Sequence, residues 1–149
     1  MIKETSAGGI LFLREKDNIL YLLLYKEAHL HYKEGWDFSR GLIEKNESAK
    51  DGATREIKEE TGIEDAKILP NFKEKISYFY KLKGQTIYKE VVFFLAETKS
   101  SDVKISKEHD DFGWFEYEEA LAKVKSKEII QKANEFLKSS KSKNLKEFL

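Results

Sequence analysis

The stretch at residues 41–63, GLIEKNESAKDGATREIKEETGI, is the most informative part of the chain and predicts a helix with a sharp stop. Ser48 is a good N-cap residue with Asp51 three residues later, and Gly62 occupies the position typical of a helix C-cap. We therefore expect a helix over about 48–61. Its narrow apolar stripe consists of Ala49, Ala53 and Ile57.

Three glutamates of this helix share one face. Glu56, Glu59 and Glu60 are three and four residues apart, so their carboxylates project within about 100° on a helix of ~3.6 residues per turn. Such carboxylates repel one another unless a cation lies between them, and hard oxygen ligands favour Mg²⁺ or Mn²⁺. Arg55 lies four residues before Glu59 and can neutralise part of this charge. Spacing alone leaves two readings open, a solvated Glu/Lys-rich helix and a divalent metal site.

The composition predicts a single globular domain over residues 1–149. Lys plus Arg and Asp plus Glu are both 27, so the net charge is zero, which argues against extended nucleic-acid binding or attraction to a membrane. The chain has no cysteine, which excludes thiol chemistry and favours a cytoplasmic location. No signal peptide is visible, and the apolar runs are too short to span a bilayer. We expect a monomer acting on a small molecule.

The other segments alternate between strand-like and helical patterns, which predicts an α/β fold. Gly8 and Gly9 inside the first strand predict a close backbone approach. A helix is expected from about 118 to 137, and the tail beyond it is either a frayed end or a last short helix. Strands are expected over 5–13, 18–25, 65–72 and 113–117, and in a hairpin of 75–98 that turns near Gly84.

The 41–63 stretch also resembles the signature motif of the Nudix hydrolase family. All nine defined positions of that motif match, with the right gaps, at Gly41, Glu47, Arg55, Glu56, Ile57, Glu59, Glu60, Gly62 and Ile63. The resemblance implies an α/β/α sandwich with a central mixed β-sheet, in which the motif folds as loop–helix–loop. It also implies metal-dependent hydrolysis of a nucleoside diphosphate linked to another group.

The resemblance assigns a role to each matched glutamate. Glu59 and Glu60 correspond to the main metal ligands, and Glu56 to a position that is a ligand or the catalytic base. A backbone carbonyl near Arg40 is expected to add a ligand. Arg55 is expected to orient the glutamates.

Two flanking segments resemble the asymmetrical diadenosine tetraphosphate hydrolases within this family. WDFSRGLIE at 36–44 is similar to their WDFPKGHVE, although Ser39 and Arg40 replace Pro and Lys. Arg40 keeps a cation for phosphate, but its planar fork binds differently from an ammonium group. The segment KISKEHDDFGWFEYEEA at 104–120 is similar to their late loop, which implies that Glu108 binds metal or acts as the base. The choice of base between Glu56 and Glu108 stays open.

The same resemblance implies a substrate site built from cations and tyrosines. Each tyrosine either stacks on an adenine or packs in the core, and both readings stay open. His109 is expected to be structural or to support a ligand. The expected substrate-binding residues are Arg40, His31, Tyr78, Tyr80, Tyr88, Lys81 and Lys83, with Lys33 and Lys89 as further phosphate-binding candidates.

The leading functional hypothesis is cleavage of diadenosine tetraphosphate into ATP and AMP with Mg²⁺ or Mn²⁺. A Nudix enzyme acting on (d)NTPs, on 5′-triphosphate ends of RNA or on inositol pyrophosphates is the alternative. A non-catalytic domain that senses a nucleotide is a third hypothesis. It is disfavoured because all of the motif glutamates are present.

Overall fold

The computed structural model describes residues 1–29 and 33–147. No helix in this part of the chain is long and apolar enough to cross a membrane. The elements are β1 (Ile2–Glu15), β2 (Asn18–Lys26), β3 (Gly35–Asp37), β4 (Ser39–Leu42), α1 (Ala49–Thr61), β5 (Lys67–Ile68), β6 (Glu74–Leu82), β7 (Gln85–Glu97), β8 (Asp111–Glu116), α2 (Tyr117–Lys123) and α3 (Lys127–Glu147).

β1 lies at the centre of one mixed sheet. It pairs antiparallel with β2 and β4 and parallel with β7. β7 pairs in turn with β5 and β6, and β2 pairs with β3 and β8. Both hairpins predicted from the sequence, β1–β2 and β6–β7, are therefore present, and the predicted central mixed sheet is confirmed.

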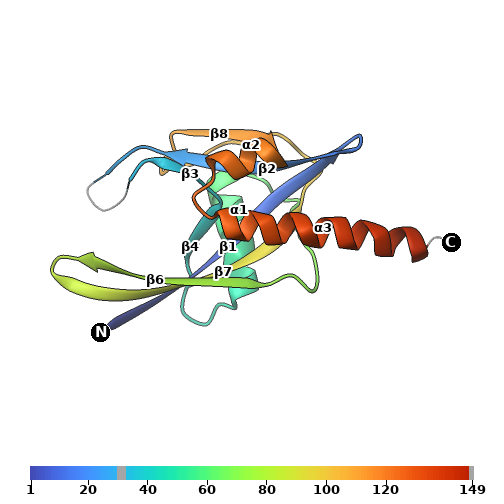
Figure 1. Cartoon of the computed structure of the whole chain (residues 1–149). Coiled ribbons are helices and arrows are strands. Elements are labelled where there is room, and N and C mark those ends of the chain that lie inside the picture. The colour runs from blue at the N-terminus through green and yellow to red at the C-terminus, as the bar shows by residue number, and fades with distance from the viewer. Residues whose placement is uncertain (30–32, 148–149) are drawn as a thin grey trace.

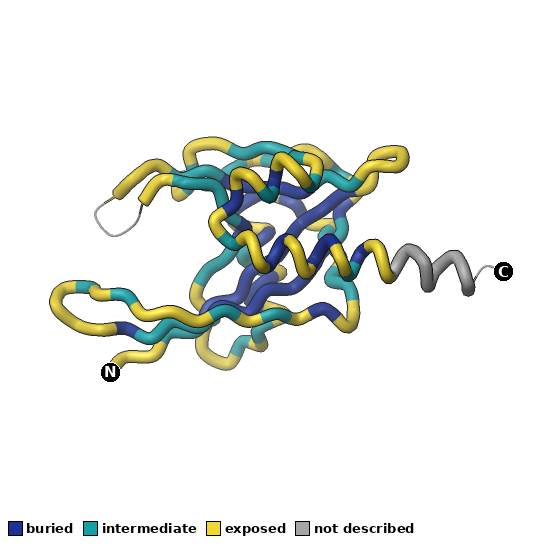
Figure 2. Tube along the Cα trace, in the orientation of Figure 1, coloured by how far each residue is buried: buried dark blue, intermediate teal, exposed yellow. Residues whose placement is uncertain are grey.

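Helices cover both faces of this sheet (Figure 1). Successive side chains of a strand point to opposite faces, and β1 is buried on both. Ile10 and Phe12 join the large core cluster with residues of α2 and α3, whereas Leu11 joins a second cluster with Ile57 of α1. Figure 2 shows the buried residues concentrated along the central strands. The predicted α/β/α sandwich is confirmed.

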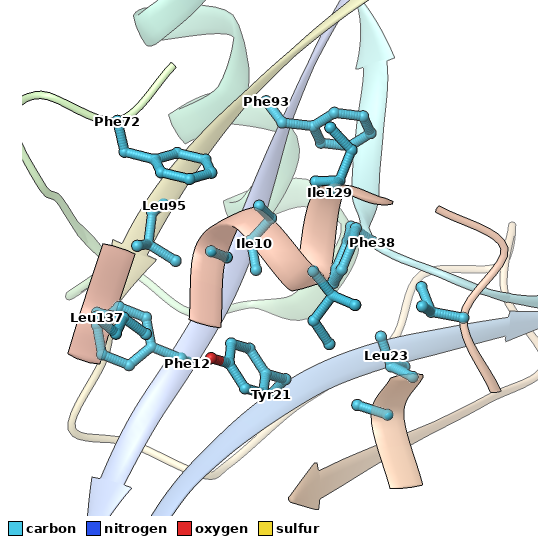
Figure 3. Close-up of a cluster of buried hydrophobic side chains, with 14 of the residues drawn as sticks. Ile10, Phe12, Tyr21, Leu23, Phe38, Phe72, Phe93, Leu95, Ile129 and Leu137 are labelled. Carbon is cyan, nitrogen blue, oxygen red and sulfur yellow. The ribbon is translucent and has the colours of Figure 1, made fainter. Parts of the chain in front are cut away.

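A buried polar contact in the core beneath α3 ties this helix to the sheet. The Tyr21 hydroxyl donates a hydrogen bond of 2.9 Å to Asn134 Oδ1. Tyr21 lies among apolar side chains that include Phe12 and Leu137 (Figure 3). This contact holds α3 in one position, because an unpartnered polar group would be costly there.

The motif helix α1 has the ends that the sequence predicts. The Ser48 hydroxyl accepts a 3.1 Å hydrogen bond from the Asp51 N–H, and Gly62 adopts the left-handed conformation at φ 75°. Ala53 and Ile57 are buried against the sheet. These caps and this stripe fix which side of the helix carries the three glutamates.

Two predictions of secondary structure were wrong, because local or tertiary contacts override the sequence pattern, and two short strands were missed. The predicted helix over 118–137 is interrupted, because Val124 is extended and Lys125 N–H bonds the Trp36 carbonyl. α3 then continues to Glu147, so the tail, for which a frayed end and a short helix were both left open, is helical and continuous with α3. The predicted strand over 65–72 is only the two-residue β5, since Pro70 lacks an N–H. The short strands β3 and β4, in the segment before the motif, were not predicted.

Replacing Gly9 with alanine should destabilise the fold by about 1–3 kcal/mol through overpacking. A Cβ atom at this position would lie 2.4 Å from Ile57 Cδ1, and Ile57 is itself buried. Denaturant unfolding measures the loss. Ile57→Val removes the clashing methyl group, so the double variant should lose less stability than the two single losses summed. Simple additivity would contradict this packing explanation.

Candidate active site

The three glutamates of α1 differ in depth. The Glu60 side chain is 3% exposed, Glu56 is 12% exposed and Glu59 is 57% exposed. Both oxygens of Glu60 are held: Oε1 accepts from the Arg40 backbone N–H at 3.2 Å, and Oε2 lies 3.2 Å from His109 Nε2. Burial lowers the pKa of His109, so the neutral ring can donate its Nε2–H to Glu60. The innermost carboxyl is therefore fixed by two other segments of the chain.

Gly41 makes room for the Glu56 carboxyl group. A Cβ atom on Gly41 would lie 2.1 Å from the carboxyl carbon of Glu56, so any larger residue would displace this group. Gly41 belongs to β4, which pairs with Ala7 of β1. The central strand thus positions β4, and β4 in turn positions Glu56. The glycine is required by close approach rather than by an unusual φ angle.

Arg55 is the centre of a hydrogen-bond network on the same side of α1. Its Nε and Nη2 atoms donate to the two oxygens of Glu47 at 2.8 and 3.1 Å. Nη1 donates to Glu56 and Glu59 at 2.9 and 3.1 Å, and Nη2 also donates to the Leu42 carbonyl at 2.9 Å. One guanidinium group therefore orients three carboxylates and joins the helix to the loop before it. The predicted orienting role of Arg55 agrees with this geometry.

The site concentrates negative charge around Glu60. The pKa of Glu60 is raised to about 9, chiefly by burial and further by a hydrogen bond with Glu56 and by the charges of Glu56 and Glu108. The Arg40 N–H acts in the opposite direction. Without a cation, Glu60 therefore holds a proton near neutral pH. A bound cation would favour the ionised form.

The donor set suits a hard divalent cation. Among the residues that the structure describes, no three His, Asp or Glu side chains are grouped as ligands of one ion. Arg55 instead contacts Glu56 and Glu59 and supplies positive charge there. All of the candidate ligand atoms are oxygens, which Mg²⁺ and Mn²⁺ prefer. A divalent ion would also relieve the repulsion between a buried carboxyl group and two neighbouring carboxylates. By this chemistry the residues fit the metal implied by the motif.

Two adjoining cavities meet at these glutamates and share Arg40, Glu60 and Glu108. The charged residues that line the acidic cavity, of about 420 Å³, are five glutamates and two arginines, namely Glu44, Glu56, Glu59, Glu60, Glu108, Arg40 and Arg55. The basic cavity, of about 530 Å³, is lined by five cations and two tyrosines, namely Lys26, Lys33, Arg40, Lys89, Lys125, Tyr78 and Tyr80, together with the carboxyl groups of Asp37, Glu60 and Glu108. Opposite charges therefore lie side by side along one continuous surface.

The β6–β7 hairpin sorts the predicted tyrosines by strand alternation. Tyr78 and Tyr80 point to one side and line the basic cavity. Tyr88 pairs across the hairpin with Phe79, and their rings lie 5.1 Å apart on the other side. Lys81 shares that side, because it is two residues from Phe79. Tyr88 and Lys81 therefore line neither cavity, and their predicted substrate contacts gain no support from the structure.

The remaining substrate-binding predictions have mixed outcomes. Lys83 lies in the hairpin turn and lines neither cavity, and His31 lies outside the described residues. Sequence reasoning missed Lys26, Asp37 and Lys125, which all line the basic cavity. No local spacing joins Lys26 to Lys125. Asp37, in contrast, stands within the segment that led to Arg40 and could have been considered.

A side-chain network anchors the tyrosine and lysine of the basic cavity. The Tyr80 hydroxyl donates to Glu4 Oε1, and Lys89 Nζ lies 3.7 Å from the same oxygen. The bond to Glu4 raises the pKa of Tyr80 to about 12, so the phenol stays neutral. Burial lowers the pKa of Lys89. β1 thus supports both cavities. Its Glu4 anchors Tyr80 and Lys89 in the basic cavity, and its Ala7 pairs with Gly41 beside the acidic cavity.

These features define a class of protein. The family model described as NUDIX domain matches residues 3–137, most of the chain. The chain therefore belongs to the Nudix family and is a Nudix hydrolase, as the motif predicts. Nudix hydrolases generally need divalent metal ions, in agreement with the carboxylate cluster on α1.

Particular relatives extend this result. The chain is 31% identical over 148 residues to the asymmetrical bis(5′-nucleosyl)-tetraphosphatase of Mus musculus, covering 91% of this chain and 96% of that protein. It is 32% identical to an RNA pyrophosphohydrolase of Campylobacter jejuni, covering 76% and 72%. Among solved structures, a binary complex of the C. elegans Ap4A hydrolase aligns with a TM-score of 0.77 and 27% identity, covering 91% and 98%.

The stability of the metal-free protein should fall as the pH rises from about 5 to 9. The folded pKa of Glu60 is about 9, against an ordinary value of 4.5. In this range the folded state keeps a proton that the unfolded chain has released. The contribution of Glu60 to the free energy of unfolding is therefore fully present below pH 4.5 and is lost as the pH rises to about 9. Denaturant unfolding in chelator at several pH values measures the slope. An equally steep slope in Glu60→Gln would contradict the assignment.

Proposed function

We propose that this Nudix hydrolase cleaves diadenosine tetraphosphate asymmetrically. In this reaction one water molecule is added across a phosphoanhydride bond and gives ATP and AMP. The observation that carries the proposal is the junction of the acidic and basic cavities at Arg40, Glu60 and Glu108. The likeness to asymmetrical tetraphosphatases over nearly the whole chain supports the same substrate.

The basic cavity suits a long, anionic substrate that carries aromatic bases. Its lysines and Arg40 can neutralise phosphate oxygens, although the chain as a whole has no net charge. Tyr78 is 37% exposed, which leaves ring surface on which an adenine can stack. We assign phosphate binding to Arg40, Lys33 and Lys89, and adenine stacking to Tyr78 or Tyr80.

The acidic cavity would hold the divalent ion. Glu56, Glu59 and Glu60 would be its ligands, with contributions from Glu108 and the Arg40 backbone carbonyl, and Mg²⁺ or Mn²⁺ fits these oxygen donors. When bound, the ion would neutralise the negative charge that develops on the phosphate groups.

The protein groups then position the water and accept its proton. Glu60 is too deeply held to move, since both of its oxygens are occupied, so it acts as a fixed ligand. Glu56 or Glu108 accepts the proton, because both line the acidic cavity. Arg55 keeps Glu56 and Glu59 in place through its two Nη1 hydrogen bonds.

A second candidate is the 5′-triphosphate end of RNA. The similarity to the Campylobacter RNA pyrophosphohydrolase and the five cations of the basic cavity favour it. A long RNA would need further positive charge along the surface, whereas the net charge of this chain is zero. A dinucleoside polyphosphate needs no such track.

Product analysis distinguishes these substrates. The protein and Mg²⁺ are incubated with diadenosine tetraphosphate, ATP, ADP-ribose and a 5′-triphosphorylated RNA, and the products are separated by anion exchange. Equal amounts of ATP and AMP, formed faster than products from the other substrates, support the proposal. Formation of two ADP molecules, or a preference for another substrate, contradicts it. A single domain, a monomeric state and a cytoplasmic location stay predictions from the sequence.

A further inference from the structure

Asp37, at the end of β3, is a cavity-lining residue to which the mechanism gives no role. It pairs with Leu24 of β2 and lines the basic cavity. Its carboxyl group has few partners in the described protein: Oδ1 is buried without a hydrogen bond, and Oδ2 lies 3.3 Å from Ser126 Oγ. The Nη2 atom of Arg40 is 4.0 Å from Oδ2, beyond hydrogen-bond distance.

Unused acceptor capacity in a buried carboxyl group is costly. Burial raises the pKa of Asp37, whereas Arg40, the Phe38 backbone N–H, Ser126 and Lys125 act in the opposite direction. A ligand that brings a hydrogen-bond donor to this carboxyl would remove the cost. A phosphate cannot do so, because its oxygens are anionic and would be repelled.

The surroundings of Asp37 suit a nucleobase. The same cavity is lined by Tyr78 and Tyr80, whose rings lie 6.3 Å apart, and by the apolar side chains of Phe38 and Leu82. Aromatic and apolar surfaces bind the face of a base, and its amino edge then requires an acceptor. Asp37 lines this cavity as a carboxyl group with spare acceptor capacity.

We propose that Asp37 determines base specificity by accepting a hydrogen bond from the amino group of a purine, the 6-amino group when the base is adenine. The inference rests on the proposed function in that it takes the ligand to be a nucleotide. It goes further, because it makes Asp37 the residue that distinguishes an amino-bearing base from one that lacks this group.

Calorimetric binding with a matched pair of ligands tests this role. The ligands are ATP and purine riboside 5′-triphosphate, which has hydrogen in place of the amino group, with Ca²⁺ replacing Mg²⁺ and chromatography verifying that both stay intact. Wild type should bind ATP about 10- to 100-fold more tightly, the usual worth of a hydrogen bond to a charged group. Asp37→Ala should bind the two ligands equally. Asp37→Asn should keep part of the difference, because its amide oxygen still accepts.

Asp102→Ala removes an exposed carboxylate that lines neither cavity, and should leave the wild-type ratio unchanged. If Asp37→Ala weakens both ligands by the same factor, or if wild type binds both equally or neither, the proposal is overturned. The ratio of affinities does not depend on cleavage of diadenosine tetraphosphate. Failure of the proposed substrate in product analysis is therefore distinguishable from failure of the role of Asp37.

Discussion

Glu60→Gln is expected to lower kcat for the preferred nucleotide by about 10²- to 10³-fold at saturating Mg²⁺, the usual effect of losing one group that stabilises developing charge. Glutamine keeps the shape of the side chain and can accept from the Arg40 N–H, but it cannot become an anionic ligand. Because Glu60 has a pKa of about 9, glutamine closely replaces its protonated form in the metal-free protein. The variant should therefore fold normally.

Steady-state kinetics over a Mg²⁺ titration, together with thermal unfolding, measures both effects. Glu64→Gln is a suitable control, because Glu64 is 74% exposed and lines neither cavity. That control should keep wild-type turnover. Near-normal turnover of Glu60→Gln with Mg²⁺ would refute the assignment of Glu60 as a metal ligand.

Arg55→Ala is expected to lower kcat by about 10²-fold, because the glutamates that Arg55 holds would shift and a displacement of about 1 Å commonly costs this much in rate. Its guanidinium group holds Glu47, Glu56 and Glu59 at once, and no neighbouring cation makes the same set of bonds among the described residues. Without it the three carboxylates repel one another, so the melting temperature in chelator should also fall. Added Mg²⁺ should restore part of that melting temperature, since the ion neutralises some of the same charge.

Arg14→Ala is the matched control for Arg55. Arg14 is also paired with a glutamate, Glu97, but at the far end of β1 and β7. Rates are to be measured well below the melting temperature of each variant. If Arg55→Ala then keeps wild-type kcat, Arg55 stabilises the fold without positioning the glutamates. Arg55→Lys should recover little activity, because an ammonium group cannot make the forked contact with Glu47.

The motif and the helix that carries it could be predicted from the sequence, because their determinants are local. Ser48 and Gly62 set the ends of α1, and spacings of three and four residues place the glutamates on one face. Alternation also separates Tyr78 and Tyr80 from Tyr88, once the hairpin register is known. That register depends on the turn at Lys83 and Gly84, which a sequence locates only approximately.

The rest of the site depends on contacts between distant segments. Lys26 and Lys125 reach one cavity because β2 and the junction between α2 and α3 lie beside β3. The same junction breaks the predicted long helix, since Lys125 N–H bonds the Trp36 carbonyl. Helical periodicity continues across this point, so no local signal marks the break. The unused acceptor of Asp37 is likewise visible only when its neighbours are known.

The central position of β1 has a consequence for redesign of the enzyme. One edge of β1 pairs with β4, which positions Glu56, and the opposite edge pairs with β7, which carries Lys89 toward the other cavity. Bond cleavage and substrate choice are thus assigned to separate neighbours of one rigid strand. A combinatorial library limited to the cavity-facing positions of the β6–β7 hairpin could change which nucleotide is accepted while the hydrolytic apparatus is inherited intact.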